Sequence, residues 1–124
     1  MNKIMSAKDA YEYAKQFALE DEKSQRLILM YTKDDGTLVG WTKREEGETM
    51  PKIPQFQQCV KIARAIIVTN HPSGSSLPDK YDIQETMAMK ELLRANGIGL
   101  TDQIIVGYKE FYSYAEEKVT FTKR

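Results

Sequence analysis

The chain has 124 residues, of which 41% are hydrophobic and 29% charged, a composition typical of a soluble globular domain. Lys and Arg together number 18, as do Asp and Glu, so the formal net charge at pH 7 is zero. A compact nucleic-acid-binding domain usually carries a basic excess, so the composition argues against a nucleic-acid partner. No stretch approaches the roughly 18 apolar residues needed to cross a bilayer.

The single cysteine, Cys59, excludes an internal disulfide and fits a reducing compartment. Residues 1–6 lack the apolar run of a signal peptide. We therefore expect a cytoplasmic protein without a membrane segment. We also expect one domain over residues 1–124, with a helix and connection in residues 1–24 and the core in residues 25–124.

The first predicted element is a helix that begins after Ser6. Ser6 is a good N-cap, and Asp9 stands three residues later, where it can return a hydrogen bond to the cap. Small and aromatic residues at helical spacing form one face, which we expect to cover a sheet: Ala7, Ala10, Tyr11, Ala14, Phe17 and Ala18. The charged run at residues 20–23 is expected to end this helix.

A predicted hairpin comes next. Residues 27–31 are a short apolar run typical of a strand covered on both sides, residues 34–36 supply a turn, and residues 37–42 a return strand. The charged residues 43–52 indicate a surface loop. Pro54 can occupy the first turn of a helix, whose predicted buried stripe is Phe56, Cys59, Val60 and Ala63.

The second half of the chain alternates strands with a long helix. Residues 65–69 form an apolar strand, a polar loop runs from Asn70 to Pro78, and a helix continues to about Asn96, where Gly97 ends it. Further strands are predicted at 104–106, 111–114 and 119–122. This order predicts an α/β (α+β) fold with a mixed sheet flanked by helices.

The apolar residues of the long helix do not form a single stripe. Tyr81, Ala88, Met89 and Leu92 lie on one side, and Ile83 and Met87 on another. Such a helix is either sandwiched or shared with a partner. Candidate interface residues for a protein partner or a homodimer are therefore Tyr81, Met87 and Met89.

The loop after the second apolar strand carries the most specific motif. Residues 70–74 read Asn-His-Pro-Ser-Gly, and an Asp follows eleven residues after the His. Residues 98–107 read Ile-Gly-Leu-Thr-Asp-Gln-Ile-Ile-Val-Gly, and residues 111–114 read Phe-Tyr-Ser-Tyr. These motifs resemble the RadC-like JAB/MPN domain family, with its His-Asn-His-Pro-Ser-Gly, Ile-x-Leu-x-Asp-His-x-Ile-x-Gly and Tyr-Ser-Phe. The resemblance implies a JAB/MPN-like (cytidine-deaminase-like) fold.

The resemblance also implies a zinc site. In the JAMM metallopeptidases of this fold, two His and one Asp hold zinc, an open position takes a water, and an upstream Glu is the general base. Carried over, His71 matches the second His and Asp82 the Asp, so both are metal candidates. Thr69 stands at the first His, and its hydroxyl is a poor zinc ligand.

Other motif positions also depart from the family. The family continues with Pro-Ser-x-x-Asp, and Asp79 stands at the Ser of this segment. Asp79 and Thr69 are therefore degenerate catalytic positions. Gln103 replaces the His of the third motif segment. The Glu position falls near Trp41 and Thr42, although a shifted Glu remains open in the next loop, at Glu45, Glu46 or Glu48.

Asp79 has two interpretations. It follows a proline and precedes an acid at the third helical position, which favours a helix N-cap. Alternatively, it is an oxygen ligand beside His71 and Asp82, a set suited to Mn²⁺ or Mg²⁺. The other loop residues are expected to preserve the shape of the loop, with Gly74 supplying backbone freedom: Asn70, Pro72, Ser73 and Gly74.

These observations favour a metal-free pseudo-metallopeptidase that acts through protein binding and needs no cofactor. The alternative is a zinc- or manganese-dependent peptidase or isopeptidase-type hydrolase with an altered ligand set. DNA binding is a third interpretation, which rests on the family's historical name and is disfavoured by the neutral charge.

Overall fold

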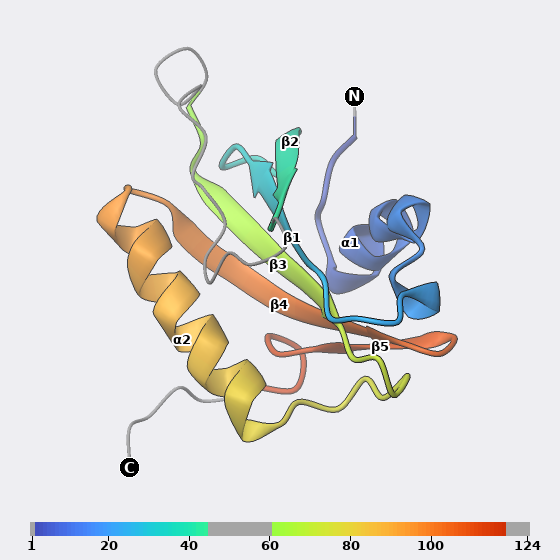
Figure 1. Ribbon diagram of the computed structural model, residues 1–124. Coiled ribbons are helices and arrows are strands. Elements are labelled where there is room, and N and C mark those ends of the chain that lie inside the picture. Colours follow the sequence, from blue (N-terminus) through green and yellow to red (C-terminus); the bar gives the residue numbers. More distant parts are fainter. Residues whose placement is uncertain (1, 45–60, 119–124) are drawn as a thin grey trace.

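The computed structural model describes residues 2–44 and 61–118, in which a five-stranded mixed sheet has a helix on each face (Figure 1). This arrangement confirms the predicted fold class. In chain order the elements are α1 (Ala7–Ala14), β1 (Leu27–Thr32), β2 (Leu38–Lys43), β3 (Arg64–Asn70), α2 (Lys80–Ala95), β4 (Gly99–Gly107) and β5 (Glu110–Ser113). Two short 3-10 turns, Lys15–Phe17 and Leu19–Asp21, follow α1.

The sheet has the strand order β2-β1-β3-β4-β5. β3 and β4 are parallel, and the other neighbours are antiparallel. A parallel pair needs a crossover connection, which α2 supplies between β3 and β4. The loop from β3 to α2 therefore starts at the carboxyl end of a central strand, where open α/β sheets commonly place their sites.

The two faces of the sheet bury separate apolar clusters. Alternate residues of β1 and β3, such as Ile28 and Val68, pack with α1. The intervening residues, such as Leu29 and Ile67, pack with α2. Each central strand is therefore apolar on both sides, which explains the continuous apolar runs in the sequence.

The first helix is shorter than predicted. Ser6 caps it as expected, accepting a hydrogen bond from the Asp9 N–H, whereas the Asp9 carboxylate accepts from Met5 N–H rather than from the cap residue. The α-helix ends at Ala14, and Ala18 adopts a left-handed φ of +49°. This turn redirects the chain so that Leu19 is buried in the cluster under α1.

The buried stripe of α2 differs from the prediction. It consists of Asp82, Thr86, Met89 and Leu93. Met89 is fully buried in the cluster between α2 and the sheet, so its assignment to an outer interface is wrong. The predicted surface on this helix reduces to Tyr81, which is 68% exposed, and the half-buried Met87. The helix ends as expected at Gly97, which has a φ of +75°.

Some predictions fall partly outside the described residues. Most of the helix expected after Pro54 lies outside them. Its last expected residues, 61–63, are described; they are not helical and lead directly into β3. The strand expected at 119–122 also lies outside. β4 begins at Gly99, five residues before its predicted start, because it pairs with β3 along the whole length of β3. None of the helices in residues 2–44 and 61–118 is long and apolar enough to span a membrane.

Asn70, the last residue of β3, ties the N-terminal part of the chain to the sheet. Its side chain is fully buried, accepts a hydrogen bond from the Arg26 N–H at 2.6 Å, and donates to the carbonyls of Leu19 and Ser24. All of these partners belong to the connection between α1 and β1. Asn70 therefore fixes this connection beside the motif loop.

Replacing Asn70 with Ala is expected to lower the free energy of unfolding by about 2–4 kcal/mol, because the buried Leu19 carbonyl and the partly buried Arg26 N–H and Ser24 carbonyl lose their partner. Chemical denaturation of the full chain measures this change. Asn96→Ala is the matched control: Asn96 is exposed and its side chain donates to the Leu92 carbonyl, so we expect a loss below about 1 kcal/mol. Equal losses for the two variants would contradict the anchoring role.

Candidate functional site

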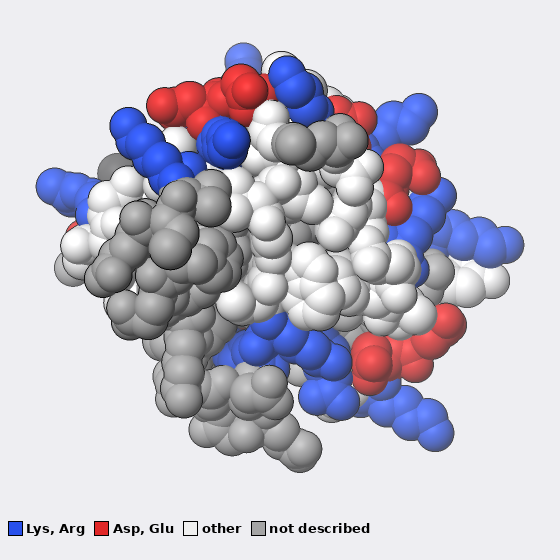
Figure 2. Space-filling view, turned by 90° about the horizontal axis from the view of Figure 1, so that it is seen from above, with Lys and Arg blue, Asp and Glu red and all other residues white. Residues whose placement is uncertain are grey.

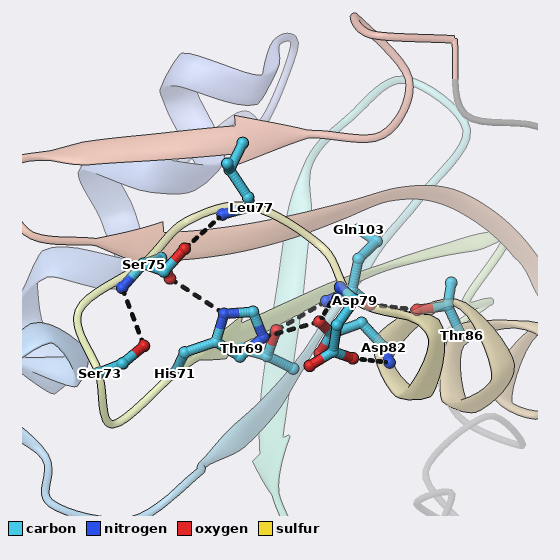
Figure 3. A network of polar contacts seen from close by, with 9 residues as sticks. All are labelled: Thr69, His71, Ser73, Ser75, Leu77, Asp79, Asp82, Thr86 and Gln103. Carbon is cyan, nitrogen blue, oxygen red and sulfur yellow. Dashed lines mark hydrogen bonds and ion pairs between the residues drawn. The ribbon is translucent and has the colours of Figure 1, made fainter.

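The motif residues converge where β3 ends and α2 begins (Figure 3). Thr69 is the penultimate residue of β3, and His71 follows the strand. Asp79 is the cap of α2, and Asp82 lies in its first turn. Suitable ligand atoms of His71, Asp79 and Asp82 lie within 4.8 Å of one another. The structure thus brings together the residues that the motif singled out.

The loop between His71 and Pro78 is held by its own hydrogen bonds. Gly74 has a φ of +84°, a conformation that favours glycine, and its N–H donates to the His71 carbonyl. The Gly74 carbonyl accepts from the Tyr108 N–H at 3.0 Å, which fastens the loop to the turn between β4 and β5. Ser73 accepts from the Ser75 N–H at 3.4 Å. Pro72 is exposed at the turn.

A second glycine makes room for this loop. A Cβ atom on Gly107 would lie 2.8 Å from the Gly74 carbonyl oxygen and 2.9 Å from the Ser76 backbone nitrogen. Such contacts with backbone atoms cannot be relieved by a side-chain rotation. The loop therefore packs directly on the end of β4.

His71 uses both ring nitrogens. Nδ1 lies 3.0 Å from the Ser75 carbonyl oxygen, and Nε2 lies 2.7 Å from Asp82 Oδ2. A carbonyl oxygen only accepts hydrogen bonds, so Nδ1 carries a proton. The short Nε2–Oδ2 contact is a direct hydrogen bond between the two side chains. The His71–Asp82 pair is thus closed by this bond.

Asp79 and Asp82 form a reciprocal capping box. Asp79 Oδ1 accepts from the Asp82 N–H at 2.9 Å, and Asp82 Oδ2 accepts from the Asp79 N–H at 2.7 Å. The bond from the Asp82 N–H lowers the pKa of the Asp79 carboxyl. Burial raises the pKa of Asp82, against the opposing effects of the Asp79 N–H and the His71 charge. Asp79 thus serves as the N-cap that the sequence favoured.

Thr69 takes part in a separate hydrogen-bonded chain. Gln103 Nε2 donates to Thr69 Oγ1 at 2.8 Å, and Thr86 Oγ1 donates to Gln103 Oε1 at 3.0 Å (Figure 3). All three side chains are buried. The first ligand position of the family is therefore occupied by a hydroxyl that already accepts a hydrogen bond.

The position of the family's general base holds no acid in the described part of β2. Trp41 points to the α1 side, where it packs on Phe17, whereas Thr42 points to the α2 side and bonds the Tyr31 hydroxyl at 2.8 Å. Arg44, just after β2, pairs with Glu85 of α2 at 2.7 Å. Glu45, Glu46 and Glu48 lie outside the described residues.

The residues at this site do not fit the family's three-ligand zinc arrangement. Thr69 replaces a nitrogen ligand with an engaged hydroxyl. The His71 and Asp82 donor atoms are 2.7 Å apart, whereas two ligands of a tetrahedral zinc ion lie roughly 3.3 Å apart at usual bond lengths. The set that remains is His71 with the carboxylates of Asp79 and Asp82.

Sequence reasoning missed two residues of the site. Thr86 lies one turn after Asp82 on the buried face of α2, a spacing that would have revealed it. Tyr114 follows β5 and is buried; burial and then the negative charge of Asp82 raise its pKa, and a hydrogen bond with Thr86 opposes the shift. Tyr114 stands where the family motif has Phe, which was the available signal.

Comparison with known proteins identifies the family. Residues 4–119 match the model of the RadC-like JAB domain, so the chain belongs to that family. The chain is 31% identical over 112 residues to UPF0758 proteins from Streptococcus pyogenes serotypes M49, M3 and M1. This match covers 84% of the chain and 49% of each relative. The chain thus spans about half the length of the curated relatives it matches.

The capping role of Asp79 predicts a specific pattern of stabilities. Asp79→Ala is expected to lower the free energy of unfolding by about 1 kcal/mol, because the Asp82 N–H loses its acceptor. Asp79→Ser keeps an oxygen acceptor and is expected to stay within about 0.5 kcal/mol of the unmodified chain. Thermal unfolding without added metal measures both variants. Equal losses for Ala and Ser would show that the carboxylate has a role other than capping.

Proposed function

We propose that this chain is a metal-free RadC-like JAB domain, a pseudo-metallopeptidase that acts by binding a protein partner or a second copy of itself. The observation that carries the proposal is the direct 2.7 Å contact between His71 Nε2 and Asp82 Oδ2. This hydrogen bond joins the two remaining ligand positions directly. A metal ion held by both atoms would have to break the bond and displace its proton.

The replacement of Thr69 supports the same proposal. A catalytic zinc ion usually has three protein ligands and one open position. Here two family ligands remain, and the hydroxyl at the third position accepts from Gln103. The residues of β2 that face α2 add no carboxylate to act as a base in the described part of the chain.

Exposed apolar side chains near the motif loop support the protein-binding part of the proposal. Leu77 in the loop, Tyr81 in the first turn of α2 and Tyr108 in the β4–β5 turn are each 66–69% exposed. Tyr108 is joined to the loop through the Gly74 carbonyl. Large exposed apolar residues at one end of a domain are typical of an interaction surface.

The charges on the face drawn in Figure 2 agree with a protein partner rather than a nucleic acid. Figure 2 shows basic and acidic side chains of the described residues distributed around the edge of one face, with uncharged residues at its centre. A phosphate backbone is normally met by clustered Lys and Arg. The mixed charges on this face fit a protein surface better.

A second candidate function is a metal-dependent hydrolase with an altered ligand set. It is favoured by the grouping of His71, Asp79 and Asp82, whose ligand atoms lie within 4.8 Å of one another. Two carboxylates and one ring nitrogen are a ligand set suited to a harder ion such as Mn²⁺ or Mg²⁺. Binding through His71 Nε2 requires its hydrogen bond with Asp82 Oδ2 to break.

Metal titration tests the two candidates. Zn²⁺ and Mn²⁺ are titrated by calorimetry into the chelator-free protein, with His71→Ala as the control variant. We expect no binding at micromolar metal for either protein, since the His71–Asp82 pair is closed. Stoichiometric binding that is lost in His71→Ala would support the hydrolase instead and justify peptidase assays.

The interaction surface predicts an effect on self-association. Sedimentation velocity at about 1–100 μM, a range in which weak homodimers dissociate, is expected to show a dimer that Tyr81→Glu disrupts. Met5→Glu is the matched control, because Met5 is equally exposed, at 68%, but lies before α1. A monomer at all concentrations would exclude the homodimer, and equal disruption by both variants would remove the assignment of this surface.

A further inference from the structure

We infer that Thr69, Gln103 and Thr86 form a buried strut that excludes the metal from the first ligand position and links β3 to α2 through β4. This inference rests on the proposed function, in which no ion joins the end of β3 to α2. It assigns a role to residues outside the His71–Asp82 pair. It also explains how the site keeps its shape without that ion.

Each residue of the strut comes from a different element. Thr69 is near the end of β3, Gln103 is in β4, and Thr86 is on the buried face of α2, one turn after Asp82. Their exposed fractions are 1%, 2% and 2%, so water does not compete for their polar atoms. The amide of Gln103 is used at both ends, since Nε2 donates to Thr69 and Oε1 accepts from Thr86.

The direction of these bonds sets what the first ligand position can do. The Gln103 N–H points at Thr69 Oγ1 from 2.8 Å, so an electropositive group already occupies the space into which a ligand at position 69 would project. A cation is repelled by an N–H donor at that place. Thr69 and Gln103 therefore act as a pair in excluding the metal: Thr69 lacks a nitrogen ligand, and the Gln103 N–H lies against its hydroxyl.

Pairing also predicts non-additive stabilities. Thr69→Val leaves the Gln103 N–H unsatisfied, and Gln103→Leu removes the donor to Thr69 and the acceptor of the Thr86 hydroxyl. Each single variant is expected to lower the Tm by about 4–8 °C. The double variant removes both members of the Thr69–Gln103 bond, so its loss is expected to be smaller than the sum of the single losses.

A matched pair of exposed residues controls this cycle. Thr101→Val in β4 and Gln84→Leu in α2 repeat the same chemical changes at exposed positions. We expect additive effects there, each within about 2 °C. Additive losses at Thr69 and Gln103, or no loss in either single variant, would overturn the strut.

Metal exclusion is tested by a gain of binding. Thr69→His/Gln103→Ser supplies a nitrogen ligand beside His71 and Asp82 and shortens the side chain that occupies its place. Calorimetry is expected to show zinc binding at least about tenfold tighter than in the unmodified chain. Thr101→His adds the same residue at an exposed site of β4 and should show no gain. Circular dichroism confirms that each variant is folded.

The outcomes separate this inference from the proposed function. Equal zinc affinity in the double variant and the unmodified chain would overturn metal exclusion by Thr69 and Gln103. Zinc or manganese binding by the unmodified chain that depends on His71 would overturn the metal-free proposal. Coupling between Thr69 and Gln103 in the stability cycle would still be measurable in that case, because it does not depend on the metal titration.

Discussion

The structure depends on one constraint: the polar side chains of Thr69, near the end of β3, and Gln103, in the middle of β4, are buried beneath α2 and must find partners there. A buried polar group without a partner costs more than its hydrogen bond contributes. The face of α2 that meets the sheet is accordingly polar in its first half, with Asp82 and Thr86, and apolar in its second half, with Met89 and Leu93. The polar half of this face forms hydrogen bonds with His71 and Gln103, and the apolar half packs in the core.

This constraint separates the shape of the motif loop from its ligand chemistry. The shape depends on backbone bonds at Gly74, on the contact with Gly107 and on the Asn70 anchor, none of which involves an ion. Asp82 takes part in both, because it closes the pair with His71 and completes the capping box. A metal ion bound to Asp82 Oδ2 would therefore compete with both bonds, including the one that caps the start of α2.

Much of the fold could be predicted from sequence patterns, because the apolar runs of β1 and β3 allow only strands covered on both faces. The helix caps at Ser6 and Asp79, the loop turn at Gly74 and the end of α2 before Gly97 could likewise be predicted from local chemistry. The point at which α1 ends could not be predicted in this way, because the chain turns at Ala18 to bury Leu19 against the sheet. Met89 was misplaced for a similar reason: periodicity shows which residues share a face, but packing decides which face is covered.

The sequence by itself determined the family motif, the loss of a nitrogen ligand at Thr69 and the neutral charge that disfavours nucleic acid. These are properties of residue type and local spacing, so no tertiary contact is needed to read them. Only the tertiary structure decided the partners of those residues. Gln103 reaches Thr69 and Thr86 because β4 lies parallel to β3 and α2 crosses above both, which joins residues up to 34 positions apart in the chain.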